Sequence, residues 1–370
     1  MSYDSQARRD TPLALKLKQR IARDGAIPVD AYMRACLYDP EHGYYVKLPA
    51  IGAGGDFITA PEISQVFGEL IGLWCAVVWQ QMGSPARLRL TELGPGRGTL
   101  MADALRAARV MPAFVAALDV ELVETNEVLI ESQRQTLGSV GVPLVWGGRL
   151  APPQAATPWI VLGNEFLDTI PVCQRVLQDG NWVRRTVVLD ATGQLQFGVD
   201  LHDAVPDQGR FPGAPPGDID EMQSTVPVLQ PLAEHAGRGR IAALLIDYGH
   251  TVSAVGDTLQ AVRQHRFEHP LTSPGEADLT CQVDFQQFAD NARALGLSVD
   301  GPVTQAEFLG SLGLAERTSR LMAANPAQAG SLEVGVARLM SPTGMGTRFK
   351  VIGLRSPAVP LLPAFPWPAR

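Results

Sequence analysis

A run of alternating glycines is the part of this sequence best suited to hold a ligand. Gly94, Gly96 and Gly98 follow an apolar segment at 88–93 and open a segment with helical spacing at 98–109. Glycine allows the backbone to turn sharply and lets a ligand approach without a Cβ atom in the way. The unpaired amide groups at the start of the following helix suit a carboxylate. The pattern therefore predicts a cofactor-binding turn between a strand and a helix.

Three residues around this turn distinguish among cofactors. Thr99 stands where a dinucleotide fingerprint of the form GxGxxG places its third glycine. Glu92, just before the glycines, would repel a pyrophosphate but could receive the amino group of a methionine moiety. Glu124 ends the next predicted strand, where an acidic residue accepts hydrogen bonds from ribose hydroxyls. These residues favour S-adenosyl-L-methionine (SAM) over NAD, while a solvated strand end remains the alternative for Glu124.

A second group of polar residues follows the apolar segment at 159–162. Glu165 and Asp168 lie at the predicted carboxyl edge of the sheet, where ligands bind in open α/β folds, and are candidate catalytic residues. Asn164, directly before them, could contact the cofactor or the acceptor. Capping of a helix by Asn164, with its two neighbours as first-turn acids, is nearly as consistent with the pattern.

Other candidate site residues come with structural alternatives. Asp247 ends the apolar segment at 241–247. It could be a catalytic residue at the carboxyl edge of the sheet, or it could stabilise the turn that follows the strand. Thr59 and Glu62 could face the cofactor from the N-terminal side, or serve as the cap and first-turn acid of a helix. The four cysteines are far apart in the sequence and form no CxxC pair, so we expect no metal site.

The elements that position these residues alternate in type. Such alternation builds a parallel sheet with right-handed crossovers, so the predicted fold class is α/β with a Rossmann-like sheet. We expect strands at 88–93, 118–124, 143–146, 159–162, 241–247, 297–303 and 348–354, and helices at 98–109, 127–137 and 284–295.

Further regions flank or interrupt this core. A capped helix is predicted from Pro12 and an apolar helix at 61–81, which together suggest an N-terminal helical cap. Apolar and polar residues alternate at 173–199, which predicts an inserted β-hairpin, and the Pro- and Gly-rich stretch at 206–217 predicts a loop. The expected boundaries are 1–85 for the cap, 86–356 for the core with its insertion at about 172–235, and 357–370 for a proline-rich tail.

The composition limits the class of protein. The chain has 370 residues, of which 46% are hydrophobic and 19% charged, and its net charge is -7 at pH 7. This composition supports a large core and argues against a nucleic-acid-binding protein that relies on bulk positive charge. The sequence offers no membrane-spanning apolar run, no secretory signal and no clear transit peptide. We expect a bacterial cytoplasmic protein, and the oligomeric state stays open.

Eight short motifs distributed over most of the chain carry a family resemblance. Residues 21–354 resemble the MidA-like family of class I methyltransferases, which includes the mitochondrial protein-arginine methyltransferase acting in respiratory complex I assembly. The motif at 55–65 is more specific to this family than the glycine turn. The motifs are YDPEHGYY at 38–45, GDFITAPEISQ at 55–65, FGE at 67–69, ELGPGRGT at 92–99, NEFLD at 164–168, IDYG at 246–249, DLT at 278–280 and MGTRFK at 345–350.

The resemblance implies a class I methyltransferase fold, SAM as the cofactor and a protein arginine as the acceptor. It also implies that this arginine belongs to a respiratory complex I subunit. It also implies that residues 55–62 pack over the cofactor site. Carboxylates such as Glu165 and Asp168 suit the paired N–H groups of a guanidinium, and a carboxylate could take up the proton lost on transfer. A small-molecule or other acceptor, and a SAM-binding assembly factor with little turnover, are the alternatives.

Overall fold

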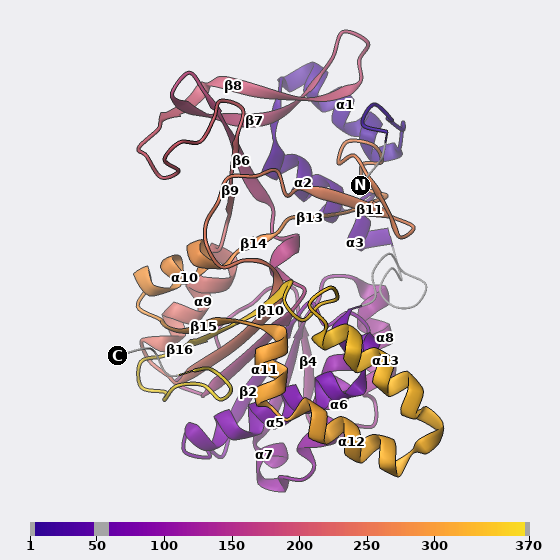
Figure 1. The fold of residues 1–370 in the computed structure, drawn as a ribbon, viewed down its shortest axis with the longest axis vertical. Helices are drawn as coiled ribbons and strands as arrows, with labels where there is room; N and C mark the ends of the chain where they lie inside the picture. Colours follow the sequence, from indigo (N-terminus) through magenta and orange to yellow (C-terminus); the bar gives the residue numbers. More distant parts are fainter. Residues whose placement is uncertain (1–3, 48–58, 367–370) are drawn as a thin grey trace.

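The computed structural model describes residues 4–47 and 59–366, which form two bodies around separate sheets (Figure 1). The larger body, low in the view, holds an eight-stranded sheet in the order β15-β16-β10-β5-β2-β3-β4, with β14 paired to β10. Neighbouring strands from β10 to β4 are parallel, whereas β16 is antiparallel to both its neighbours. These strands are β2 (Leu88–Leu93), β3 (Leu118–Val123), β4 (Leu144–Gly147), β5 (Trp159–Asn164), β10 (Ile241–His250), β14 (Val283–Asp284), β15 (Ser298–Thr304) and β16 (Phe349–Arg355). The predicted α/β class is confirmed.

Helices cover both faces of this sheet, so its central strands are apolar on both sides. Helices of this region include α5 (Gln65–Gln81), α6 (Thr99–Ala108), α7 (Pro112–Ala117), α8 (Glu127–Leu137), α9 (Val226–Ala236) and α10 (Phe285–Ala294). One face packs on α5 and α6, and Leu90 of β2 belongs to that core. The opposite face packs on α9 and α10, together with Val161 of β5.

The helix α5 approaches α6 closely because two glycines lie at the contact. A Cβ atom on Gly72 would lie 2.3 Å from the carbonyl oxygen of Ala104, and one on Gly68 would lie 2.6 Å from Cβ of Asp103. Such a close approach of two backbones requires residues without a side chain. The two glycines therefore fix how α5 sits against the helix that follows the glycine turn.

The second body, high in Figure 1, is built from the N-terminal segment and the expected insertion. Its sheet has the order β1-β7-β6-β9, with β8 paired to β7. Its elements are α1 (Pro12–Asp24), β1 (Ile27–Pro28), α2 (Val29–Tyr38), β6 (Val172–Gln178), β7 (Asn181–Leu189), β8 (Leu195–Pro206) and β9 (Ile219–Gln223). Leu17 of α1 and Met33 of α2 share a core with Val187 of β7. The inserted region is thus larger than the expected hairpin, because β9 and the distant β1 join its strands.

The N-terminal region expected at 1–85 divides between the two bodies. Whereas α1 and α2 pack on the second sheet, α5 packs on the larger one. The helix expected at 61–81 is broken into α4 (Ala60–Ile63) and α5. The break falls at Ser64, whose hydroxyl oxygen accepts a hydrogen bond from the amide of Val66 and thereby caps α5.

Smaller elements complete the described part of the chain. The proline-rich segment at 357–366 packs on the larger body, where Val359 and Phe365 are buried and Trp74 Nε1 donates to the carbonyl oxygen of Pro363 at 3.1 Å. Within residues 4–47 and 59–366, every helix is too short or too polar to cross a membrane. The remaining elements are α3 (Tyr44–Lys47), η1 (Leu167–Thr169), β11 (Gln260–Arg263), β12 (Arg266–Glu268), β13 (Asp278–Thr280), α11 (Gln305–Ser311), α12 (Leu314–Ala324), η2 (Pro326–Gln328) and α13 (Ala329–Met340).

Candidate functional site

A cavity of about 790 Å³ opens at the carboxyl ends of β2, β3 and β5. Its volume lies in the range of roughly 300–1,000 Å³ that ligand sites occupy. Four of the residues predicted for the site border it, namely Gly94, Gly96, Glu124 and Glu165. The cavity therefore lies where open α/β folds bind their ligands.

The glycine turn presents backbone to this cavity. Gly94 and Gly96 have φ angles of 58° and 55°, a conformation that residues with a side chain rarely adopt. Gly98 does not border the cavity but precedes the first residue of α6. A Cβ atom there would lie 3.5 Å from the side chain of Gln133, so this glycine packs the turn against α8.

Glu124 is held at the edge of the cavity by the start of α8. Its Oε1 accepts hydrogen bonds from the backbone amides of Thr125 at 2.7 Å and Asn126 at 2.8 Å. Burial raises the pKa of Glu124, and these hydrogen bonds lower it in part. Its Oε2 has one long contact among the described residues, at 3.4 Å to Gln133 Nε2. This oxygen is suited to accept a hydrogen bond from a ligand hydroxyl.

Gln133 is a residue of the site region that the sequence did not point to. It is fully buried on α8, and its Nε2 donates to the carbonyl oxygen of Gly96 at 2.7 Å. Its Oε1 accepts from Trp146 Nε1 at 2.8 Å. One side chain therefore connects the glycine turn, Glu124 and β4. A single glutamine inside a helix carries no local signal of such a role.

Glu92 and Asn164 lie beside the turn, outside the lining of the cavity. Each has a buried oxygen, Oε2 of Glu92 and Oδ1 of Asn164, that has no hydrogen-bond partner among the described residues. Both continue the alternation that places Leu90 and Leu162 on the α5 and α6 face of the sheet. Burial raises the pKa of Glu92 to about 8. Buried unpaired acceptors of this kind fit a ligand that brings donors, such as an ammonium group.

Glu165 borders the cavity from the end of β5. Its φ of 53° is a left-handed conformation for a residue other than glycine, and such strain concentrates at functional sites. Its Oε1 accepts from the amide of Ala60 and from Asn164 Nδ2, each at 3.0 Å. Burial, with the charge of Asp168 as a smaller cause, raises the pKa of Glu165 to about 7. The carboxyl group can therefore exchange a proton near neutral pH.

Asp168 and Asp247 lie behind Glu165 and do not border the cavity. Oδ2 of Asp247 accepts from the amides of Leu167 at 2.8 Å and Asp168 at 3.1 Å, and Oδ1 accepts from that of Tyr248 at 2.9 Å. These backbone contacts match the second role considered for Asp247, in which its side chain stabilises a turn. Burial raises the pKa of Asp168 to about 6, and its Oδ1 is a buried oxygen without a partner among the described residues.

Glu62 and Thr59 contact the glycine turn and α4 rather than the cavity. Glu62 Oε1 accepts from Thr99 Oγ1 at 2.6 Å, and its carboxylate pairs with Arg97 inside the glycine motif. The Thr59 side chain makes no capping hydrogen bond, while its carbonyl oxygen accepts from the amide of Glu62 at 3.0 Å. Residues 55–58, which the resemblance also places at the pocket, lie outside the described residues.

Residues of the second body complete the cavity. Tyr38, Tyr45 and Arg34 border it, as does Phe166, whose ring lies 3.1 Å from a Cβ atom placed on Gly94. The two tyrosines belong to the motif at 38–45, which carried the resemblance but no assigned role. Only the packing of the N-terminal helices against the larger body brings them to the carboxyl edge.

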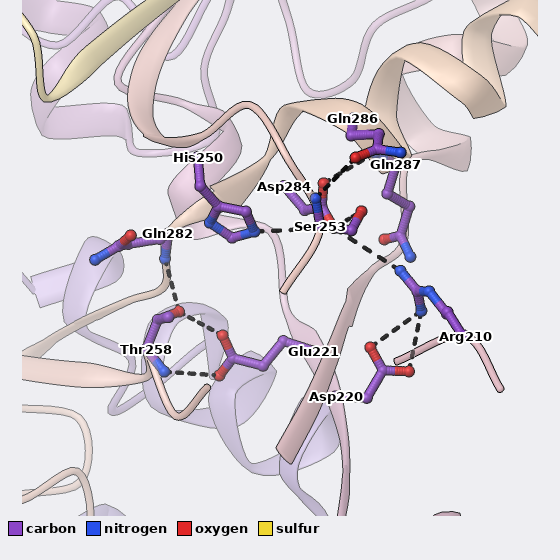
Figure 2. Close-up of polar contacts among 10 residues, drawn as sticks. All are labelled: Arg210, Asp220, Glu221, His250, Ser253, Thr258, Gln282, Asp284, Gln286 and Gln287. Atoms are coloured by element: carbon purple, nitrogen blue, oxygen red, sulfur yellow. Dashed lines mark hydrogen bonds and ion pairs between the residues drawn. The ribbon is translucent and has the colours of Figure 1, made fainter. Parts of the chain in front are cut away.

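A second hollow of about 250 Å³ lies on β9 and the end of β10. Figure 2 shows that polar groups in and beside the hollow contact one another: Thr258 donates to Glu221 through its amide and its hydroxyl, and Ser253 Oγ donates to Asp284 at 2.6 Å. His250 Nε2 lies 3.8 Å from Asp284, which also caps α10. In the described ranges no group of three or more His, Cys, Asp or Glu side chains could hold a metal ion.

Comparison with known proteins shows to which protein family this chain is related. The family profile described as "Putative S-adenosyl-L-methionine-dependent methyltransferase" matches residues 70–303. The chain is 35% identical over 374 residues to the mitochondrial protein arginine methyltransferase NDUFAF7 homologue of Drosophila melanogaster, covering 92% of this chain and 84% of that protein. It is 33% identical over 381 residues to the mitochondrial protein arginine methyltransferase NDUFAF7 of Homo sapiens, covering 93% and 83%.

Solved structures agree with the sequence comparison. A Burkholderia thailandensis protein bound to S-adenosyl-homocysteine superimposes with a TM-score of 0.83 and 26% identity over 97% of each chain. A native structure from the same organism gives a TM-score of 0.81 with 27% identity over 99% of each chain. The resemblance to the class I methyltransferase fold is confirmed. The chain belongs to the family of SAM-dependent methyltransferases that also contains the mitochondrial NDUFAF7 proteins.

Proposed function

We propose that the chain transfers a methyl group from SAM to an arginine side chain of a protein. The observation that carries the proposal is one continuous cavity that brings the glycine turn and Glu124 together with Glu165. One half suits a nucleoside and the other half a cationic acceptor. Methyl transfer is an in-line displacement, so bringing the two reactants into line is the main task of the enzyme.

The cofactor half consists of Gly94, Gly96 and Glu124, supported by Glu92 and Asn164. Bound SAM supplies an electrophilic methyl group on a positively charged sulfur. Oε2 of Glu124 would accept a hydrogen bond from a ribose hydroxyl, and the unpaired oxygens of Glu92 and Asn164 would accept from the amino group. The similar Burkholderia thailandensis protein bound to S-adenosyl-homocysteine supports this assignment.

Three other predicted residues, Gly98, Glu62 and Thr59, would act on the cofactor half through the turn. Gly98 packs the turn on α8, and Glu62 holds it from α4 through Arg97 and Thr99. Thr59 starts that short helix. We assign these residues to the positioning of the turn rather than to direct contact with the cofactor.

Glu165 is the proposed catalytic carboxylate of the acceptor half. The described hydrogen bonds of this residue fall on Oε1, so Oε2 is available to a guanidinium in the cavity. A carboxylate there would hold the planar cation and could receive the proton that is lost on methyl transfer. Asp168 would act through Glu165, whose pKa it helps to raise, and Asp247 would fix the turn between them.

The names of the relatives support arginine as the acceptor. Proteins from Drosophila melanogaster and Homo sapiens that are 35% and 33% identical to this chain are named protein arginine methyltransferases. With the family resemblance, this favours an arginine of a respiratory complex I subunit as the target of this chain.

Transfer of labelled methyl groups tests the proposal. The purified chain is incubated with tritiated SAM and lysate proteins from cells that lack this gene, and the labelled proteins are hydrolysed for amino-acid analysis. We expect the label in methylarginine, and at least a tenfold lower signal with Glu165→Gln.

The matched control is Glu131→Gln, which alters an exposed carboxylate on α8 and should transfer label like the natural protein. Label in a small molecule, or in an amino acid other than arginine, would overturn the arginine assignment. No incorporation into any fraction would contradict turnover altogether.

A further inference from the structure

We infer that Tyr38 and Tyr45 form an aromatic wall in the acceptor half of the cavity and that this wall selects a cationic side chain over a neutral one of the same shape. The inference rests on the proposed function, which supplies the guanidinium as the cation. Both residues border the cavity beside the proposed cofactor and acceptor residues.

The hydroxyl groups of the two tyrosines are held by hydrogen-bond partners within the protein. Tyr38 Oη contacts Thr169 Oγ1 at 3.1 Å, and Tyr45 Oη donates to Asp278 Oδ1 at 2.9 Å. Tyr38 keeps 39% of its surface exposed and borders the cavity. The ring centroids lie 5.8 Å apart, so the two rings are neighbours in one wall.

Carboxylates near the rings strengthen the attraction for a cation. Burial, followed by the charges of Asp278 and Asp168, raises the pKa of Tyr45 well above its usual range. Burial chiefly raises the pKa of Tyr38 to about 12, with smaller contributions from the same two carboxylates. The rings therefore stay neutral at physiological pH, and the two carboxylates lie close enough to add negative charge beside them.

Carboxyl groups outnumber cationic side chains in the lining of the cavity among the described residues. The three carboxylates Glu124, Glu165 and Glu234 border it, against the two cations Arg34 and Arg149. Arg34 is exposed, one helical turn before Tyr38. An aromatic face attracts a cation within about 6 Å of its centre, and this contact works on a methylated guanidinium as well as on a free one. Such a wall would hold the acceptor while leaving its nitrogens free for Glu165.

Binding of two small probes to the full chain saturated with S-adenosyl-homocysteine tests the inference. The probes are N-acetyl-arginine methylamide and its neutral counterpart N-acetyl-citrulline methylamide, titrated by NMR or calorimetry. We expect the arginine probe to bind and the citrulline probe to bind at least tenfold more weakly. Tyr38→Leu should weaken the arginine probe about fivefold, whereas Tyr38→Phe, which keeps the ring, should bind like the natural protein.

A matched control is Phe267→Leu, which removes an aromatic ring that is 41% exposed on β12 and away from the cavity. S-adenosyl-homocysteine affinity should be the same in all three variants. Equal binding of the two probes, no binding of the arginine probe, or loss of S-adenosyl-homocysteine affinity in Tyr38→Leu would each overturn the inference. If methylarginine forms in the transfer assay while these results are negative, the aromatic wall fails alone; if no methylarginine forms, the proposed function fails.

Discussion

At the scale of single residues, the site is defined by carboxyl groups that the fold keeps partly protonated. Burial raises the pKa of Glu92 to about 8 and that of Glu165 to about 7. Buried acids with raised pKa values are costly unless a ligand compensates them, and they concentrate at functional sites. Glu165 borders the cavity and should affect the pH dependence of activity. Glu92 lies beside the glycine turn and should affect the pH dependence of stability.

Glu165 should set the acidic side of the activity profile. A bound guanidinium favours the ionised carboxylate, so kcat/KM should rise as the pH increases through about 7 and then level off. Glu165→Gln should lower kcat/KM about 100-fold and remove this rise. Rates measured between pH 5.5 and pH 9 with a protein acceptor check the prediction, with Glu131→Gln as the control. A rise that persists unchanged in Glu165→Gln would assign it to another group.

Glu92 should make the protein less stable as the pH rises. In the unfolded chain this acid has an ordinary pKa near 4.5, against about 8 in the folded state. Between these values the unfolded state loses its proton first, so the free energy of unfolding falls with increasing pH. Glu92→Gln removes this effect and should be more stable than the natural protein by about 2–5 kcal/mol at pH 8, with a much smaller difference at pH 4.5.

Urea unfolding at the two pH values measures this difference. The same variant should bind S-adenosyl-homocysteine more weakly, since it loses the carboxylate proposed for the amino group. A stability difference that is equal at both pH values would show that the Glu92 carboxyl is not the titrating group.

At the scale of elements, α8 and α5 determine the geometry of the glycine turn. The helix α8 reaches the turn through Gln133, and α5 reaches the following helix through Gly68 and Gly72. None of these three residues was predicted for the site from the sequence pattern. Each helix makes a separate prediction.

Gln133→Met should weaken cofactor binding while the protein stays folded. The methionine side chain has a similar length but no amide, so the carbonyl oxygen of Gly96 and Nε1 of Trp146 lose their partner. A lost hydrogen bond of this kind costs about 1–3 kcal/mol, which predicts at least a fivefold weaker affinity for S-adenosyl-homocysteine by calorimetry. Gln135→Met alters an exposed glutamine of the same helix and is the control. Equal affinities for the two variants would contradict a role of Gln133.

Gly72→Ala should destabilise the larger body. The added Cβ atom would lie 2.3 Å from a backbone oxygen of α6, so one helix must move, at a cost of about 1–3 kcal/mol in the free energy of unfolding. Gly330→Ala is the matched change in α13, where nothing lies within 4 Å of the added atom, and it should be neutral or slightly stabilising. Thermal unfolding compares the two. Equal melting temperatures would mean that α5 and α6 are not held at this distance.

At the scale of the whole molecule, local patterns predicted the larger sheet well and the second body poorly. The strand at 88–93 and the helices at 127–137 and 284–295 follow from apolar runs, glycines and caps that act over a few residues. The strand β1 could not be predicted in the same way, because two residues pair with β7 only after the chain has folded back on itself. Tertiary packing decides such short elements.

The same limit applies to the site. Gly94, Gly96, Glu124 and Glu165 were predicted because a strand, a turn and a helix in sequence place them at one edge. Tyr38 and Tyr45 reach that edge through the contact between the two bodies, which no local pattern encodes. Residues that reach the site through tertiary contacts can be identified only from the three-dimensional structure.

The central claim is that the glycine turn holds the cofactor beside the acceptor carboxylate. Titration of S-adenosyl-homocysteine into Gly96→Ala and Gly193→Ala tests it, because both glycines have a positive φ but Gly193 lies in an open turn far from the cavity. We predict that both variants fold, that Gly193→Ala binds like the natural protein, and that Gly96→Ala binds at least tenfold more weakly. Equal affinity for Gly96→Ala and the natural protein would contradict the account.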